Sequence, residues 1–221
     1  SAKPNLRIIV ASTRPTRVGG AVGAWVREMA EAHGEFAVHM TDLRALDLPL
    51  MNEPHHPSQQ NYTKAHTKAW SADIAAADAF VFVMPEYNFS FTAPLKNALD
   101  YLQKEWMHKP VGIVSYGGIS GGLRAVTTIQ SVFLALSLHP VKPAVTIQFV
   151  ASMIGEDNTF TRPIPSSAQP PRCWTNCCAT RPHCDPCADK PSSSPILCGS
   201  ETICRKHIAS IKEAPICLQS P

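Results

Sequence analysis

The chain has 221 residues, enough for one domain built around a single core. Hydrophobic residues make up 44% and charged residues 17%, as in globular proteins, and a net charge of +3 without a basic run argues against a nucleic-acid partner. No apolar stretch reaches 18 residues, so we expect no membrane span. The N-terminal residues lack the apolar core of a signal peptide, although a leader removed before residue 1 stays open.

Residues 6–149 alternate between strand and helix patterns. Strands are expected at 6–11, 36–43, 79–84, 111–116 and 141–149, and helices around 22–30 and at 61–77, 92–106 and 122–137. Thr92 can cap the third helix, in whose first turn Pro94 is tolerated. The stretch 44–60, with three prolines, is expected to be a surface loop.

This alternation predicts an α/β fold: an open parallel five-stranded sheet with helices on both faces. The expected strand order is 2-1-3-4-5, which leaves a ligand crevice between the first and third strands. A last helix normally follows the fifth strand, and here an irregular tail stands in its place. Without such a helix, we expect an apolar strip next to the first and fifth strands to stay exposed.

The first crevice loop follows the first strand. Hydroxyls, guanidiniums and free backbone N–H groups at a helix N-terminus are typical of an anion site. The candidate residues are Ser12, Arg14, Arg17, Val18 and Gly19. The alternative is a polar turn with solvated charges.

The loop after the third strand carries Pro85, Glu86, Tyr87 and Asn88. An aromatic ring beside an amide and free backbone groups suits a flat heteroaromatic ligand. Alternatively, Tyr87 is a half-buried packing residue and Glu86 a solvated carboxylate or an ion-pair partner.

The fourth strand runs into Ser115, Tyr116, Gly117 and Gly118, and four glycines within six residues let backbone approach a ligand closely. The alternative for this loop is a flexible turn. Because three successive strands end in such loops at one edge of the sheet, the coincidence favours a binding site more than any single loop does.

These stretches resemble the NADPH-dependent FMN reductase family, which includes quinone, azo-dye and chromate reductases. The resemblance covers about residues 6–160 and rests on the Ser-Thr-Arg loop, on 77–88, on 94–100 and on 115–118. It implies a flavodoxin-like fold, non-covalent FMN, NADPH or NADH as electron donor, a cytoplasmic location, and a homodimer or homotetramer.

By this resemblance, Arg14 and its loop neighbours hold the FMN phosphate, residues 85–88 contact the ribityl chain and the ring edge, and Tyr116 with Gly117 and Gly118 closes over the ring. The flavin itself carries the hydride to a flavin, quinone or other small acceptor, so no catalytic side chain is required. Alternatives are a flavodoxin-like electron carrier, which the slightly basic charge disfavours, and an inactive relative with a damaged C-terminus.

No metal site is expected, because loop histidines such as His55, His56 and His66 are usually solvated. All eight cysteines lie between Cys173 and Cys217, and ten of the 20 prolines fall in the last 59 residues. We therefore divide the chain into a folded domain over 1–160 and a Cys/Pro-rich tail over 161–221. We consider three hypotheses for this tail: a zinc module, a disulfide framework, and a frameshifted or mis-spliced end. We favour the last.

Overall fold

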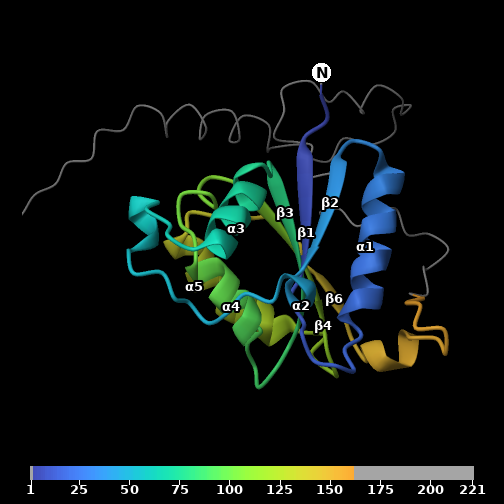
Figure 1. Cartoon of the computed structure of the whole chain (residues 1–221). Helices are drawn as coiled ribbons and strands as arrows, with labels where there is room; N and C mark the ends of the chain where they lie inside the picture. The colour runs from blue at the N-terminus through green and yellow to red at the C-terminus, as the bar shows by residue number, and fades with distance from the viewer. Residues whose placement is uncertain (1, 162–221) are drawn as a thin grey trace, which may run out of the picture. The chain divides into compact units, whose positions relative to one another are not determined.

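The protein forms one parallel sheet, described here from a computed structural model over residues 2–161 (Figure 1). Its strands are β1 (Asn5–Val10), β2 (Ala37–Asp42), β3 (Ala79–Pro85), β4 (Pro110–Tyr116), β5 (His139–Pro140) and β6 (Val145–Ile147). The order is β2-β1-β3-β4-β5, with β6 also pairing to β4. Every pairing is parallel, which confirms the expected order 2-1-3-4-5.

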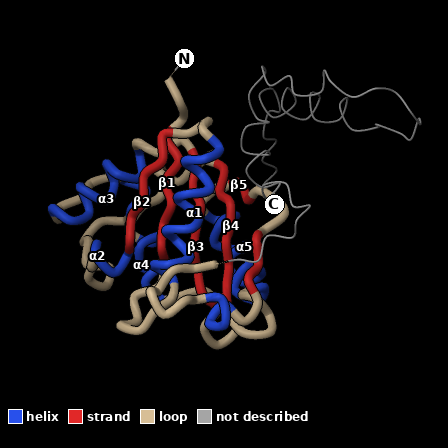
Figure 2. The backbone as a smooth tube through the Cα atoms, turned by 90° about the vertical axis from the view of Figure 1, so that its right-hand side faces the viewer, coloured by secondary structure: helices blue, strands red, loops and turns tan. Residues whose placement is uncertain are grey.

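Helices cover both faces of this sheet (Figure 2). They are α1 (Gly19–His33), α2 (Leu43–Leu46), α3 (Ala65–Ala75), α4 (Ala93–Asp100) and α5 (Leu123–Ala135), with 3-10 turns at Pro57–Gln59 and Val150–Met153. In Figure 1, α1 lies on one side of the sheet, and α3, α4 and α5 lie on the other. Because side chains alternate along each strand, β1, β3 and β4 contribute to a separate apolar core on each side of the sheet.

The two cores differ in composition. The core on the α3–α5 side is rich in aromatic side chains, and Trp106 packs against Trp70, Phe80 and Phe82 with ring centroids 5.0–6.2 Å apart. The core on the α1 side consists mainly of valine, isoleucine, leucine and alanine from β1, β3, β4, β6 and α1. Such burial supplies most of the folding free energy and holds the strand ends in register.

Several expected boundaries were wrong for local reasons. The fifth strand is split into β5 and β6, because Pro140 and Pro143 have no N–H to donate to a ladder. Helix α3 begins at residue 65 rather than 61, since the Glu53 carboxylate accepts the N–H groups of Thr63 and Lys64 just before it. The expected loop 44–60 contains the last residues of α2 and a 3-10 turn.

Helix α4 starts as expected, with the Thr92 hydroxyl accepting the Leu95 N–H, but it ends at Asp100. Leu102 and Trp106 therefore lie beyond the helix, Trp106 in a turn, and both are nevertheless buried. The Trp106 indole N–H donates to the Leu99 carbonyl near the end of α4, which fixes this turn against the aromatic core. The burial of Trp106 was thus predictable from the sequence, whereas the secondary structure at this residue was not.

The segment after β6 packs against the α1 side of the sheet. Val150 and Phe160 are buried there, and the Phe160 ring meets Trp25 of α1 edge-on at 5.2 Å. Val145 and Ile147 of β6 are also buried, so the expected exposed strip is not found at these strands. The Cys/Pro-rich tail lies outside the described residues, and no helix within 2–161 is long and apolar enough to cross a membrane.

Candidate functional site

The loop after β1 is anchored before it turns into α1. The Ala11 N–H donates to the Val83 carbonyl of β3, and the Thr92 hydroxyl donates to the Ala11 carbonyl at 2.9 Å. The same hydroxyl caps α4. One buried threonine therefore fixes the first loop against the helix that follows β3.

Arg17 is committed to contacts within the protein. Its guanidinium forms a two-pronged ion pair with Asp42 at the end of β2 and also donates to the Ser12 carbonyl. Burial by itself raises the pKa of the Asp42 carboxyl, but the hydrogen bonds from Arg17 and from the Arg44 N–H outweigh burial and lower it. Asp42 therefore stays ionised, and Arg17 braces the loop from behind rather than facing solvent.

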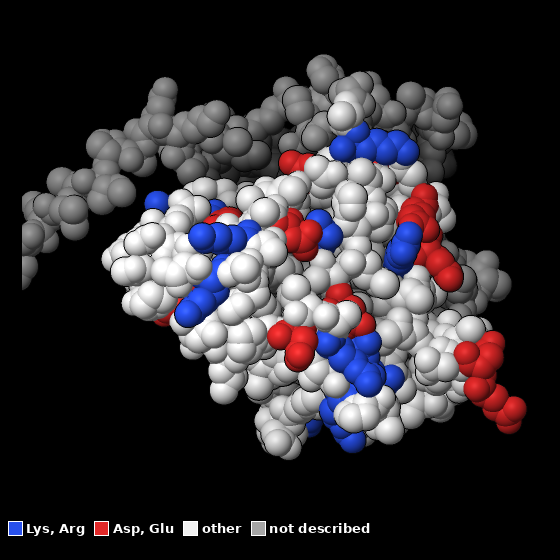
Figure 3. Space-filling model, in the orientation of Figure 1, with Lys and Arg blue, Asp and Glu red and all other residues white. Residues whose placement is uncertain are grey.

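Arg14 is the exposed cation of this loop. Within the described residues it makes no hydrogen bond or ion pair through its side chain; the guanidinium lies 5.9 Å from the centroid of the Tyr87 ring. The backbone N–H groups of Thr13, Arg14 and Thr16 also find no acceptor there. In Figure 3, basic side chains gather over α2 and this loop, with acidic ones at their edge.

The N-terminus of α1 adds further unpaired donors. Val18 occupies the cap position, and no side chain of residues 2–161 caps the helix. The next residue, Gly19, must be glycine, because a Cβ there would collide with the hydroxyls of Ser12 and Tyr116. Loop and helix thus form a concentrated array of N–H groups beside a free guanidinium, an arrangement that binds phosphate.

The Ser12 and Tyr116 hydroxyls are buried beside Gly19, and neither makes a well-formed hydrogen bond within the described residues. Burial raises the pKa of the Tyr116 phenol, so the group stays protonated. Since its ring is 4% exposed, Tyr116 supports the first loop from beneath and has no open face for stacking. The sequence predicted that Tyr116 closes over a ligand ring, and the geometry favours a supporting role beneath the loop instead.

A tight turn projects from the end of β3. Tyr87 and Ser90 exchange two backbone hydrogen bonds of 2.9 Å, and the two residues between them, Asn88 and Phe89, have φ values of 48° and 65°. Two left-handed central residues define the hairpin turn that matches strand twist. Asparagine suits this backbone, whereas an aromatic residue there is unfavourable.

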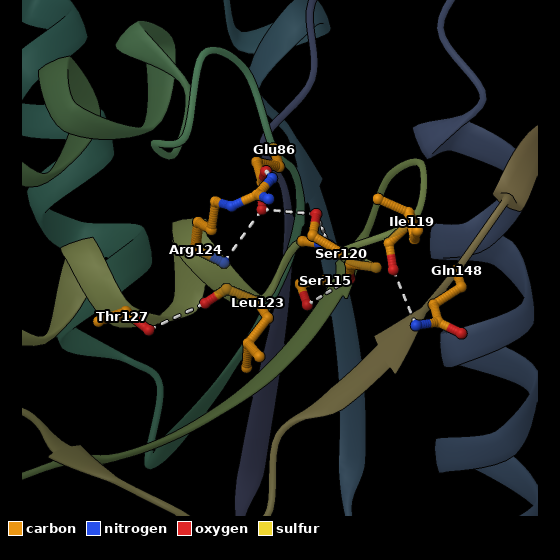
Figure 4. A network of polar contacts seen from close by, with 10 residues as sticks. Glu86, Ser115, Ile119, Ser120, Leu123, Arg124, Thr127 and Gln148 are labelled. Atoms are coloured by element: carbon orange, nitrogen blue, oxygen red, sulfur yellow. Dashed lines mark hydrogen bonds and ion pairs between the residues drawn. The ribbon is translucent and has the colours of Figure 1, made fainter.

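Glu86 joins this turn to the glycine loop after β4 (Figure 4). Its carboxylate accepts hydrogen bonds from the Ser120 hydroxyl at 2.9 Å, from the Arg124 N–H at 3.0 Å and from Arg124 Nη1 at 3.0 Å. The side chain is 7% exposed. Burial alone raises the pKa of this carboxyl, but the donors from Ser120 and Arg124 lower it overall, so Glu86 is an ionised clamp.

The glycine loop is held from its other side as well. The Gln148 side chain donates to the Ile119 carbonyl at 2.8 Å, and the Phe149 and Val150 N–H groups donate to Gly118 and Gly117. Within the described residues, three successive N–H groups, those of Gly118, Ile119 and Ser120, have no acceptor. A row of this kind suits the carbonyl edge of a heterocycle.

Close packing explains the glycines that end this loop. A Cβ on Gly122 would lie 2.7 Å from the Ser115 Cβ, and φ is +87° at this position. The Ser115 hydroxyl donates to the Gly121 carbonyl at 2.9 Å. Ser115 is therefore a buried support for the loop rather than an exposed donor.

The three loops meet as the sequence suggested. The Arg14 guanidinium lies 5.9 Å from the centre of the Tyr87 ring, the Tyr116 hydroxyl lies beside Ser12 and Gly19, and the Glu86 N–H donates to the Tyr116 carbonyl at 3.1 Å. Pro85 pairs in register with Tyr116, and Gly117 lies near the Glu86 Cβ.

Sequence reasoning missed Asp42, Phe89, Ser120 and Arg124. An acidic residue at the end of a strand beside an arginine-rich loop was the available signal for Asp42. Phe89 directly follows Asn88, and Ser120 and Arg124 lie two and six residues after Gly118.

Comparison with known proteins gives a consistent result. A model of the NADPH-dependent FMN reductase family matches residues 4–152. An NAD(P)H-dependent FMN reductase of Schizosaccharomyces pombe is 41% identical over 148 residues, which are 65% of this chain and 74% of the relative. A probable NADPH:quinone oxidoreductase of Oryza sativa is 34% identical over 155 residues, 67% of this chain and 77% of the relative.

The fold also matches solved structures. That of FerB, a flavoenzyme NAD(P)H:(acceptor) oxidoreductase from Paracoccus denitrificans, superposes with a TM-score of 0.59. It covers 72% of this chain and 87% of FerB at 22% sequence identity, which establishes a likeness of fold alone.

Proposed function

Since the chain belongs to the NADPH-dependent FMN reductase family, we propose that it binds FMN at the edge where the three loops meet and uses NAD(P)H to reduce quinone-type small molecules. The observation that carries this proposal is the convergence of Arg14, Tyr87 and Tyr116 on one edge of the sheet. The residues present fit the cofactor, because a guanidinium and a row of N–H groups that have no partner within residues 2–161 gather there with two buried hydroxyls.

Arg14 and the N–H groups of the first loop would hold the phosphate. Arg17 is a positioning residue, since its guanidinium is taken by Asp42. With these roles, Arg14 should contribute binding energy that depends on the phosphate, and Arg17 should contribute to the conformation of the loop.

Tyr87 and the glycine loop would enclose the ring, with the N–H groups of residues 118–120 aimed at its polar edge. When bound, the flavin supplies the hydride-carrying centre that links the nicotinamide to the acceptor. The described side chains supply orientation, and Glu86 keeps the turn and the glycine loop at a fixed separation.

We also propose a homo-oligomer, supported by the outer face of α5. The polar side chains of Thr127, Gln130 and Ser131 donate to carbonyls of their own helix, and Leu134 is 83% exposed. Such a face presents little that water solvates strongly, which favours burial against a second copy. Light scattering measures the particle mass directly.

We also propose a cytoplasmic location, which rests on the resemblance to the family.

The test of FMN binding compares Arg14→Gln with Arg27→Gln, which removes the same charge from an exposed pair on α1. Purified protein should be yellow and should bleach with NADPH in the absence of air. Arg14→Gln should raise the Kd for FMN roughly tenfold to a hundredfold while changing the Kd for riboflavin little, because riboflavin lacks the phosphate. Equal losses for both ligands would place the phosphate elsewhere.

A further inference from the structure

Phe89 has an unusual place at the tip of the turn after β3. Its φ is 65°, a left-handed backbone that disfavours bulky side chains, and 64% of the residue is exposed. Both features cost free energy, and such strain is retained mainly where it serves a function. Neither core contains this ring.

Arg124 completes the feature. Its guanidinium carbon lies 4.2 Å from the centroid of the Phe89 ring, within the range of a cation–π contact. Nη1 is held by the Glu86 carboxylate, while Nε and Nη2 make no hydrogen bond within the described residues. The clamp thus holds the guanidinium on the ring and leaves donors pointing away from Glu86.

This aromatic and cationic pair lies where the turn after β3 meets the glycine loop, since Glu86 holds Arg124 and Arg124 lies over Phe89. Phe89 follows Tyr87 by two residues, and Arg124 follows the glycine loop whose N–H groups have no acceptor. Ile119 and Leu123, which both precede Arg124 in the chain, are 70% and 56% exposed. An exposed aromatic ring with a guanidinium against it therefore lies next to the loops proposed to enclose the flavin ring.

We propose that Phe89 and Arg124 select planar acceptors that carry an anionic group, such as a sulfonated naphthoquinone. This inference rests on the proposed reductase function. The quinone stacks on the aromatic and apolar surface, and its sulfonate accepts hydrogen bonds from the free guanidinium donors. Overall, NADPH, a quinone and a proton give NADP⁺ and a hydroquinone: the nicotinamide supplies a hydride, and the single proton comes from solvent.

The experiment measures kcat/KM for 1,4-naphthoquinone and for its 2-sulfonate at low salt in the FMN-loaded full chain. Arg124→Gln should reduce the ratio of sulfonated to parent substrate about threefold to tenfold, as expected for one half-exposed charge contact. A general disturbance of the clamp lowers both rates and cancels in the ratio. Arg27→Gln breaks an exposed Arg–Glu pair on α1 and should leave the ratio unchanged.

A second readout does not depend on turnover. Naphthalene-2-sulfonate cannot accept a hydride, so its Kd reports binding alone, and Arg124→Gln should raise that Kd several-fold. Phe89→Leu should raise KM for both quinones together, since it removes the flat ring but not the charge.

Three outcomes overturn the proposal: a ratio that Arg124→Gln does not move, a ratio that Arg27→Gln moves equally, or a change in particle mass with Phe89→Leu, which assigns the ring to an interface between copies. Failure of the proposed reductase function differs from all of these, because the wild-type protein would then not be bleached by NADPH or would not reduce the parent quinone.

Discussion

Replacing Glu86 by glutamine removes one negative charge and almost no volume from the clamp between the turn after β3 and the glycine loop. Three donors from Ser120 and Arg124 meet on this carboxylate. Glutamine offers a single acceptor oxygen and turns an NH₂ group toward at least one of these donors.

The size of the effect follows from burial. Hydrogen bonds to a charged group contribute about 1.5–3 kcal/mol each, and leaving a buried donor unpaired costs a similar amount. Arg124 is 47% exposed and can turn toward water, so its share is smaller. We therefore expect Glu86→Gln to lower the free energy of unfolding by about 2–3 kcal/mol near neutral pH.

Urea unfolding followed by tryptophan fluorescence measures this loss, since Trp70 and Trp106 are buried. The pH dependence provides a second check. The pKa of Glu86 in the folded protein lies below its ordinary value of 4.5, so the carboxylate stabilises the fold above that value and loses its contribution as the pH falls through the lower folded pKa. The difference in the free energy of unfolding between wild type and Glu86→Gln should therefore disappear over the same range of pH.

Glu31→Gln is the matched control, because Arg27 and Glu31 form an exposed pair one turn apart on α1. Its cost should stay below about 0.5 kcal/mol at every pH. The reasoning is refuted if Glu86→Gln costs no more than this control, or if its deficit persists unchanged under acid conditions where the protein still folds.

Two further substitutions probe the first loop. Gly19→Ala places a Cβ against the Ser12 hydroxyl and should abolish FMN binding or weaken it at least tenfold. Gly20→Ala, which has no atom within 4 Å of the new Cβ, should bind FMN normally. Titration of FMN fluorescence compares the two variants, and equal affinities would contradict the geometry. Thr92→Ala removes both the cap of α4 and the bond to Ala11, so thermal and urea unfolding should show a loss of about 2–3 kcal/mol, with Thr92→Ser recovering most of it; no recovery would mean that packing of the methyl group dominates.

Local sequence pattern was sufficient for the architecture. Buried strands alternating with amphipathic helices allow few parallel topologies, and the observed order matches the expected one. Because all parallel strands end at the same edge, the loops after β1, β3 and β4 had to meet, and the contacts of Arg14 with Tyr87 and of Tyr116 with Ser12 follow from that geometry. Thr92 was recognisable as a cap because capping depends on near neighbours in the chain.

The roles of individual side chains were decided only by tertiary structure. Arg14 and Arg17 look equivalent in sequence. Asp42, 25 residues from Arg17, binds the Arg17 guanidinium, whereas the Arg14 guanidinium has no such partner within residues 2–161. For Glu86 the sequence left open a ligand contact, a solvated carboxylate and an ion-pair partner, and only the fold shows that Arg124, 38 residues away, forms an ion pair with it. A hydrogen bond depends on distances of a few ångströms between segments that are far apart in the sequence. The pattern of residues therefore determined where the candidate site lies, and packing determined which residues are held by other side chains and which are left to face a ligand.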